Sequence, residues 1–281
     1  MKAEGQVIHF LNQQKPFSGM LYSNAQSQCN LLIAPAMGIT ARYYGKLANW
    51  LCEQGFSVLV IDYQGTGMSE SQIRDSITLS DWVKNIEIAG RWLKELYPGS
   101  STVFLGHSIG SQLFGFVSDT LLFDKAVMLA SSTGYWQDTP GPRKWVNYFL
   151  LNIILPISNA IWGYTNARFF RQGENYPKLP ALQWRKWCMN KEYLEMELDQ
   201  TQINNYNHYS RKVVLVWFSD DPIANEVTTL KFARLFKTTS VQRIEINPSD
   251  VGKSKIGHTG FLSRKYADRL WPEFVLNIRY S

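Results

Sequence analysis

A serine between two glycines, at the junction of an expected strand and an expected helix, restricts the fold of this chain more than any other feature. The run 102–105 is apolar and β-branched, Gly106-His107-Ser108-Ile109-Gly110 follows it directly, and 111–117 is expected to be helical. The glycines permit a corner too tight for a Cβ atom, which leaves the serine Oγ pointing out of the fold. Ser108 is therefore a candidate nucleophile. Since the five-residue pattern also arises by chance in roughly one chain in ten of this length, its meaning depends on residues elsewhere.

Strand-like and helix-like segments alternate along most of the chain. The expected strands are 7–11, 17–22, 30–35, 57–62, 102–105, 126–130, 212–218 and 241–246. The expected helices are 41–54, 79–98, 111–117, 224–237 and a last one from Phe261 onward. This alternation predicts an α/β fold with a mainly parallel sheet flanked by helices, preceded by an antiparallel hairpin. In such sheets chemistry gathers at the carboxyl ends of the strands.

One long segment breaks the alternation. It holds several prolines, tryptophans and tyrosines but few strand signals. We therefore expect a first part of the core over 1–133, a helical cap inserted over 134–210, and a second part of the core over 211–281.

Within this insertion, 145–164 is almost free of charge, which raises the question of a membrane. A spanning helix needs about twenty apolar residues, and Asn147, Asn152, Pro156 and Asn159 interrupt the run. We expect the lining of a cap or a partly buried pair of helices. Contact with a membrane surface is the less favoured alternative.

Composition limits the classes of partner. The 281 residues are 45% hydrophobic, enough for one large core, and the net charge of +6 comes from singly scattered basic residues, unlike a nucleic-acid-binding segment. Cys29, Cys52 and Cys188 lack metal-ligand spacing and are expected to be reduced thiols. The first residues lack the apolar core of a signal peptide, so we expect a cytoplasmic protein. We expect no metal and no cofactor.

A serine hydroxyl becomes a good nucleophile only when a base removes its proton, and the base needs a carboxylate to orient it. Asp220 and Asp221 both follow the strand 212–218, and His258 precedes the last expected helix. The candidates thus follow one another as serine, aspartate and histidine. The other histidines, His9, His107 and His208, lack such a context.

The intermediate of acyl transfer carries an oxyanion, which needs two N–H donors. The amide of Ile109, next to the serine, is one candidate. The turn Ala34-Pro35-Ala36-Met37-Gly38 ends another strand, and Met37 is the second candidate. Asp62 lies before the serine in the chain and is expected to be structural.

These segments together resemble the α/β-hydrolase superfamily, in the branch grouped with S33-type serine aminopeptidases and monoglyceride lipases. The resemblance covers the whole chain and rests on the turn at Met37, the loop 62–69, the elbow at Ser108, Asp221-Pro222 and Gly257-His258. The cap segment 179–187 is similar to that of uncharacterised bacterial α/β-hydrolases.

The resemblance implies an α/β-hydrolase fold with a helical cap and a Ser108-His258-Asp221 triad. It favours Asp221 because the acid of the family usually precedes proline. Two departures are Gln64, where the family commonly has arginine, and the long 37-residue interval between Asp221 and His258.

We therefore expect a serine hydrolase that cleaves a small or medium-chain carboxylic ester through an acyl-enzyme. The expected partner is a small acyl compound as substrate, and no nucleic acid is expected to bind. The alternatives are a peptidase or amidase of the same mechanism, and a non-catalytic binding protein that retains the fold. Apolar side chains of the cap are expected to line the acyl pocket, among them Trp136, Trp145, Phe149, Ile153, Trp162, Trp184 and Trp187. The sequence does not fix the oligomeric state.

Overall fold

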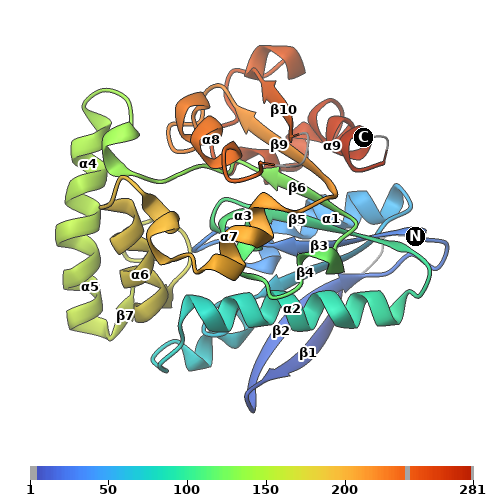
Figure 1. Ribbon diagram of the computed structural model, residues 1–281, viewed down its shortest axis with the longest axis horizontal. Coiled ribbons are helices and arrows are strands. Elements are labelled where there is room, and N and C mark those ends of the chain that lie inside the picture. The colour runs from blue at the N-terminus through green and yellow to red at the C-terminus, as the bar shows by residue number, and fades with distance from the viewer. Residues whose placement is uncertain (1–4, 238–240, 280–281) are drawn as a thin grey trace.

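The computed structural model describes residues 5–237 and 241–279, and eight of its strands form one central sheet (Figure 1). In chain order they are β1 Gln6–Asn12, β2 Lys15–Tyr22, β3 Cys29–Ala34, β4 Ser57–Asp62, β5 Ser101–His107, β6 Lys125–Leu129, β9 Lys212–Phe218 and β10 Val241–Ile246. They lie in the order β1-β2-β4-β3-β5-β6-β9-β10. Each corresponds to a run that the sequence predicted.

The sheet is mainly parallel, as expected. β1 pairs with β2 and β2 with β4 in antiparallel register, and the pairs from β4 to β10 are all parallel. Leu31 and Ile33 of β3 belong to one hydrophobic cluster, whereas Leu32 and Ala34 belong to another. Strands buried on both faces need apolar residues at every position, which explains the continuous apolar runs.

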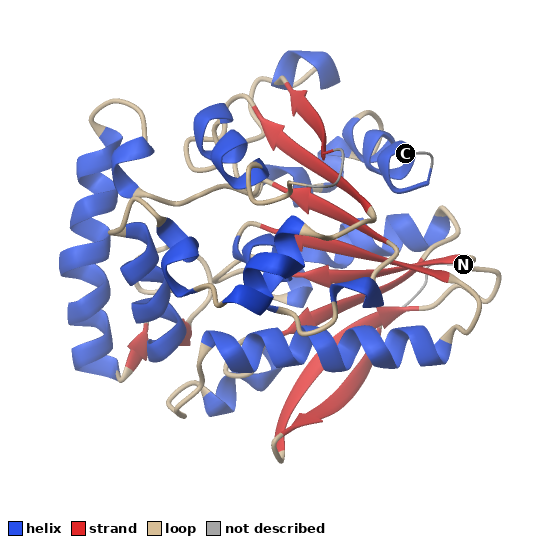
Figure 2. Ribbon diagram, in the orientation of Figure 1, coloured by secondary structure: helices blue, strands red, loops and turns tan. Residues whose placement is uncertain are grey.

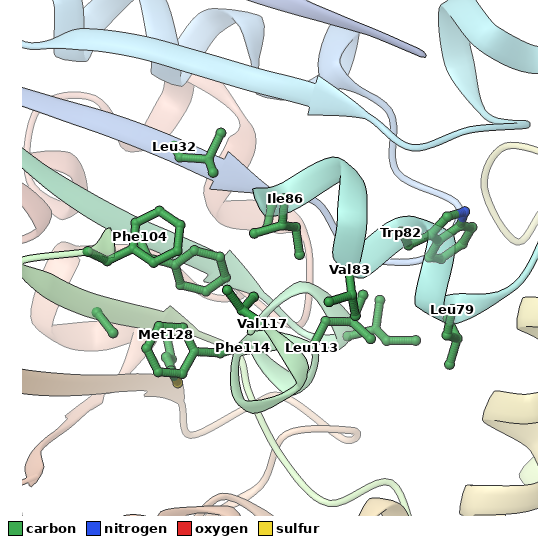
Figure 3. Close-up of a cluster of buried hydrophobic side chains, with 14 of the residues drawn as sticks. Leu32, Leu79, Trp82, Val83, Ile86, Phe104, Leu113, Phe114, Val117 and Met128 are labelled. Atoms are coloured by element: carbon green, nitrogen blue, oxygen red, sulfur yellow. The ribbon is translucent and has the colours of Figure 1, made fainter. Parts of the chain in front are cut away.

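Helices cover both faces of the sheet (Figure 2). The cluster that contains Leu32 and Ala34 packs around α2 (Leu79–Leu96), where Trp82 and Ile86 lie with Phe104 and Met128 of the strands (Figure 3). The cluster that contains Leu31 and Ile33 packs around α1 (Ala41–Glu53) and α9 (Leu270–Arg279). A capping box begins α2, because the side chains of Thr78 and Asp81 each bind the other residue's backbone amide.

The segment between β6 and β9 is mostly helical. Its elements are α4 Arg143–Phe149, a π-helical turn Leu150–Ile154, α5 Leu155–Trp162, β7 Tyr164–Thr165, β8 Tyr176–Pro177, α6 Lys178–Cys188 and α7 Gln200–Asn207. The arrowheads of the parallel strands point toward the side of the molecule where α4, α5 and α6 lie (Figure 1). The domain boundaries at 134 and 210 remain a prediction.

Three predicted helices have other bounds. The expected helix 111–117 is a short α3 (Ile109–Gln112) followed by a 3₁₀ turn, Phe114–Phe116. The expected helix 224–237 is α8 (Glu226–Ala233), which begins late because the Asn225 side chain caps it. The last helix begins at Leu270 and not at Phe261, because 3₁₀ turns occupy the intervening residues.

The apolar run 145–164 also differs from the expectation of two helices. Arg143–Trp162 is one continuous helix of 20 residues, although Pro156 lies within it. Proline lacks an N–H group and clashes with the carbonyl group four residues earlier. The π-helical turn Leu150–Ile154 lies immediately before α5 and widens the helix there, so the chain passes the proline without breaking.

Candidate active site

Ser108 lies at a strained corner between β5 and α3. Its φ and ψ angles are 53° and −118°, a combination that residues with a side chain rarely adopt. A Cβ atom on Gly106 would lie 2.6 Å from Ser111 Cα, and one on Gly110 would lie 2.1 Å from the Ala34 carbonyl oxygen. Both glycines are therefore required, and the half-buried Ser108 is held at the carboxyl end of β5.

The same contact places the turn after β3 against the elbow. Since Gly110 of α3 packs on the Ala34 carbonyl, the turn that contains Met37 lies beside the amino end of α3. Ile109 is the first residue of α3, where an amide has no partner within the helix. Within the described ranges, no hydrogen bond occupies the amides of Met37 and Ile109. Both are thus available to an acceptor such as a carbonyl oxygen that gains negative charge.

Asp221 and His258 form a close pair at the ends of β9 and of the loop after β10. His258 Nδ1 lies 2.7 Å from Asp221 Oδ2, and the Asp221 side chain is fully buried. Its other oxygen accepts hydrogen bonds from the amides of Ile223 (2.8 Å) and Ala224 (3.1 Å). Burial raises the pKa of Asp221, but His258 and the two amides outweigh it and hold that pKa below its usual range. The acid is therefore ionised at neutral pH.

Asp220 contacts the same loop at different atoms. Its two oxygens accept hydrogen bonds from the amides of Ile256 and Gly257, each at 2.9 Å. These bonds hold the backbone immediately before His258. Asp221 instead binds the imidazole ring.

The structure brings Ser108 and His258 to the same edge of the sheet, but no hydrogen bond links their side chains in the described chain. Because Asp221 binds Nδ1, the nitrogen left to face a nucleophile is Nε2. Contacts between a nucleophile and its base are often long without substrate and tighten when substrate binds.

Sequence reasoning missed the role of a second histidine, His107, which is buried directly before Ser108. His107 Nε2 lies 3.0 Å from the His258 carbonyl oxygen, and Nδ1 lies 2.7 Å from Tyr44 Oη. Burial lowers the pKa of His107 to about 3, with a further lowering by His258, so the ring is neutral. A carbonyl oxygen can only accept, so Nε2 carries the proton and Tyr44 Oη donates to Nδ1.

Tyr44 extends this chain of hydrogen bonds to the turn after β3. The Ala36 amide donates to Tyr44 Oη at 3.0 Å. One neutral network therefore joins the turn next to Met37 to the backbone of His258. The only signal for it in the sequence is the position of His107 directly before Ser108.

Asp62 supports the loop after β4, consistent with the structural role expected for it. Its side chain accepts hydrogen bonds from the amides of Ala41 (2.7 Å) and Met68 (3.1 Å). The neighbouring Gln64 is buried, and its amide oxygen accepts from Asn12 (3.0 Å) and Asn85 (3.3 Å). Neutral amides thus surround Gln64, in place of the loop salt bridge that an arginine there would allow.

The helical insertion is tied to the turn that contains Met37. The Glu174 amide donates to the Gly38 carbonyl at 2.7 Å. The buried Glu174 carboxylate accepts from Arg42 and Tyr43, each at 2.8 Å, and also from Arg168. These bonds fix the loop between β7 and β8 over the turn.

The aromatic and apolar residues of the insertion divide into two groups. Trp187 is buried in the cluster that contains Ile109, and Trp184 packs against it. Trp145, Phe149 and Ile153 are exposed. The expectation that these three line an acyl pocket is wrong, because composition does not say which way a helix turns its apolar side.

No three His, Cys, Asp or Glu side chains gather within the described ranges as a metal ion would require. The groups brought together at this edge of the sheet are those of acyl transfer: a hydroxyl, an imidazole, a carboxylate and two unoccupied amides.

The sequence matches the family described as "Serine aminopeptidase, S33" over residues 25–235, which is most of the chain. The chain belongs to this family. The predicted resemblance and the α/β-hydrolase fold are both confirmed. A search of curated protein sequences gives no match to this α/β-hydrolase.

Solved structures of the same fold include several hydrolases. A soluble variant of monoglyceride lipase from Saccharomyces cerevisiae is 13% identical with a TM-score of 0.71, over 98% of this chain and 95% of that one. A carboxyl esterase from Bacillus coagulans is 13% identical with a TM-score of 0.68, over 98% of both chains. An N-formylmaleamic acid deformylase from Pseudomonas putida is 15% identical with a TM-score of 0.58, over 93% and 98%. At these identities the likeness concerns the fold alone.

Proposed function

We propose that this α/β-hydrolase is a serine hydrolase that cleaves a carboxylic ester through an acyl-enzyme. The observation that supports this most is the pairing of His258 with the buried, ionised Asp221 on the side of the sheet where the elbow presents Ser108. A hydroxyl, an oriented base and a carboxylate are the groups that nucleophilic attack on an acyl carbon requires.

In the first step, Ser108 Oγ forms a bond to the ester carbonyl carbon while His258 Nε2 takes the hydroxyl proton. The imidazolium cation is stabilised by Asp221, which binds Nδ1. The tetrahedral intermediate then collapses, the bond to the alcohol oxygen breaks, and His258 returns its proton to that oxygen. Ser108 is left acylated.

In the second step, water takes the place of the alcohol. His258 removes a proton from the water, whose oxygen bonds to the acyl carbon, and the bond to Ser108 Oγ breaks as the proton returns to the serine. The products are a carboxylic acid and the free enzyme.

The amides of Met37 and Ile109 are proposed to bind the oxyanion of both intermediates. Their availability supports this role, because neither amide donates a hydrogen bond within the described residues. Loss of one such donor typically lowers kcat by about 10²–10³.

We propose a small or medium-chain apolar acyl group as the substrate class. The support is an apolar cluster that extends from the sheet through Ile109, with Met37 packed against it, to Leu151 and Trp187 of the insertion. The printed names of the lipase and the carboxyl esterase agree with an ester. The family description favours a second candidate, an aminopeptidase or amidase that uses the same residues.

Hydrolysis of p-nitrophenyl esters of increasing acyl length, beside aminoacyl p-nitroanilides, tests the proposal. Each methylene buried in an apolar site contributes up to about 0.8 kcal/mol, so kcat/KM should rise roughly three- to fourfold per methylene from acetate until the site is full. The Ser108→Ala variant is the control for background hydrolysis. A steady fall from acetate onward would contradict an apolar acyl site, and faster turnover of the anilides would establish the peptidase alternative.

A further inference from the structure

The helix Arg143–Trp162 lies along the outer side of the insertion, where α4 and α5 form one column at the edge of the molecule (Figure 1). It is the one helix in the described residues long and apolar enough to cross a membrane. Only 22% of its most apolar stretch is buried. The core helix of a globular protein is mostly buried, so packing against the core does not explain this composition.

Two asparagine side chains of this helix face the protein. Asn152 accepts a hydrogen bond from Arg185 of α6 at 2.6 Å. The buried Asn159 donates to Thr165 at 3.0 Å. On a helix at the surface of a water-soluble protein, side chains of this kind normally face the solvent. Here that arrangement is inverted.

Five apolar side chains of this helix form an outward stripe. Its members are Trp145, Phe149, Ile153, Ile157 and Ile161, and successive members lie four residues apart, about one helical turn. Trp145 and Ile161, near the two ends, are 60% and 65% exposed. A continuous apolar stripe of about four and a half helical turns on the outside of the fold marks a contact surface.

The charged residues near the stripe indicate which kind of partner it contacts. No aspartate or glutamate occurs between residues 139 and 173. Arg143 and Lys144 begin the helix, and the exposed Arg171 follows it. The stripe therefore has basic residues at its amino end and in the segment that follows the helix, and no acidic residue along it. Aromatic side chains at its ends, such as Trp145 and Phe169, are typical of residues at the level of lipid headgroups.

We propose that this outward stripe lies in the surface of a membrane that contains anionic lipids, with the helix parallel to the bilayer plane. Such helices insert their apolar side to a depth of about 5–10 Å and bind more strongly when basic residues meet anionic headgroups. The helix does not span the bilayer, because spanning would separate Asn152 and Asn159 from their partners on the protein side.

Flotation of the purified protein with vesicles tests this surface. The wild type should float with vesicles of phosphatidylcholine mixed with phosphatidylglycerol, and less with phosphatidylcholine alone. The triple variant Trp145→Gln, Ile157→Gln, Ile161→Gln should bind at least tenfold more weakly. The matched control changes Leu121, Val227 and Leu276 to glutamine, which are similarly exposed (51–57%) on other elements. This control should bind like the wild type, and the melting temperatures of both variants should match that of the wild type.

A second triple variant, Arg143→Gln, Lys144→Gln, Arg171→Gln, tests the charges. Each lost basic residue should weaken binding to the anionic vesicles by roughly fivefold, with little effect on neutral ones. Ser108→Ala should float like the wild type, so vesicle binding is measured independently of the proposed chemistry.

Three outcomes would overturn the proposal. The first is a wild-type protein that stays unbound with anionic vesicles, and the second is a stripe variant that binds as well as the wild type. The third is a dimer in solution that the stripe variant converts to a monomer while no vesicle binding occurs, which would assign the stripe to a second copy of the chain.

Discussion

At the scale of single residues, two adjacent carboxylates after β9 bind different atoms of one loop. Asp221 Oδ2 binds the His258 ring, and Asp220 binds the amides of Ile256 and Gly257. If the proposed mechanism holds, Asp221 acts on the tautomer and cation of the imidazole. Asp220 acts only through the position of the backbone.

Replacement of each aspartate by asparagine separates these roles. Asp221→Asn should lower kcat by roughly 10⁴, because an amide can stabilise the wrong imidazole tautomer. Asp220→Asn retains one acceptor oxygen and should lower kcat by less than about 10², with a loss of stability near 1 kcal/mol. Steady-state kinetics with one ester substrate compares the two. A larger loss of kcat in Asp220→Asn would make Asp220 the acid.

The low pKa of His107 predicts how the free energy of unfolding depends on pH. Its pKa is about 3 in the folded chain, chiefly through burial, against an ordinary value of 6.5. As pH falls below 6.5, His107 becomes protonated in the unfolded chain but stays neutral in the folded chain. The folded state therefore loses stability between pH 6.5 and 3, by up to about 1.4 kcal/mol per pH unit for this group.

Urea unfolding of the wild type and of His107→Gln at several pH values from 6.5 to about 4.5 measures this contribution. Glutamine does not titrate, so the variant should lack this slope even though it is less stable overall. Parallel loss of stability in the two proteins would show that His107 is protonated in the folded state.

At the scale of elements, Tyr206 is one of the residues through which the insertion docks on the elbow helix. Tyr206 of α7 is buried, and its hydroxyl donates to the carbonyl oxygen of Gln112, the last residue of α3. Its ring lies so close to Gly115 that a Cβ atom there would be 1.9 Å away. Gly115 thus allows α7 to approach the helix that begins at Ser108.

Gly115→Ala should destabilise the protein by about 1–3 kcal/mol, as expected for overpacking of a buried contact. The double variant Gly115→Ala, Tyr206→Val should be less destabilised than the sum of the two single variants, because the clash is gone. Chemical unfolding measures both. If the two losses of stability simply add, the strain in Gly115→Ala does not come from the Tyr206 ring.

At the scale of the whole molecule, the sequence predicted the sheet well because buried strands have a strong pattern. All eight strands were predicted within a few residues, and the parallel arrangement followed from their alternation with helices. The positions of Ser108 and Asp221 just after strand ends followed from the same rule, whereas His258 lies at the end of the loop after β10. These signals lie within short segments of sequence, so they can be recognised before any tertiary contact is known.

What the sequence missed depends on contacts between distant residues. The bond between Tyr206 and Gln112 of α3 joins residues 94 positions apart, and the bond between Tyr44 and His107 joins residues 63 positions apart. The apolar run 145–164 was recognised from composition, but the outward side of the helix that it forms is set by the polar partners of Asn152 and Asn159. No local pattern contains this information.

The central claim, that Ser108 is the nucleophile of a serine hydrolase, is tested most directly by covalent labelling with a fluorophosphonate probe. Intact mass and peptide mapping should show one adduct on the wild type, at Ser108, and none on Ser108→Ala, whose kcat should be lower by about 10⁴–10⁶. Ser111→Ala is a matched control, because Ser111 Oγ is buried nearby without a hydrogen-bond partner in the described chain, and it should be labelled like the wild type. An adduct that persists in Ser108→Ala, or a wild type that stays unlabelled, would contradict the claim.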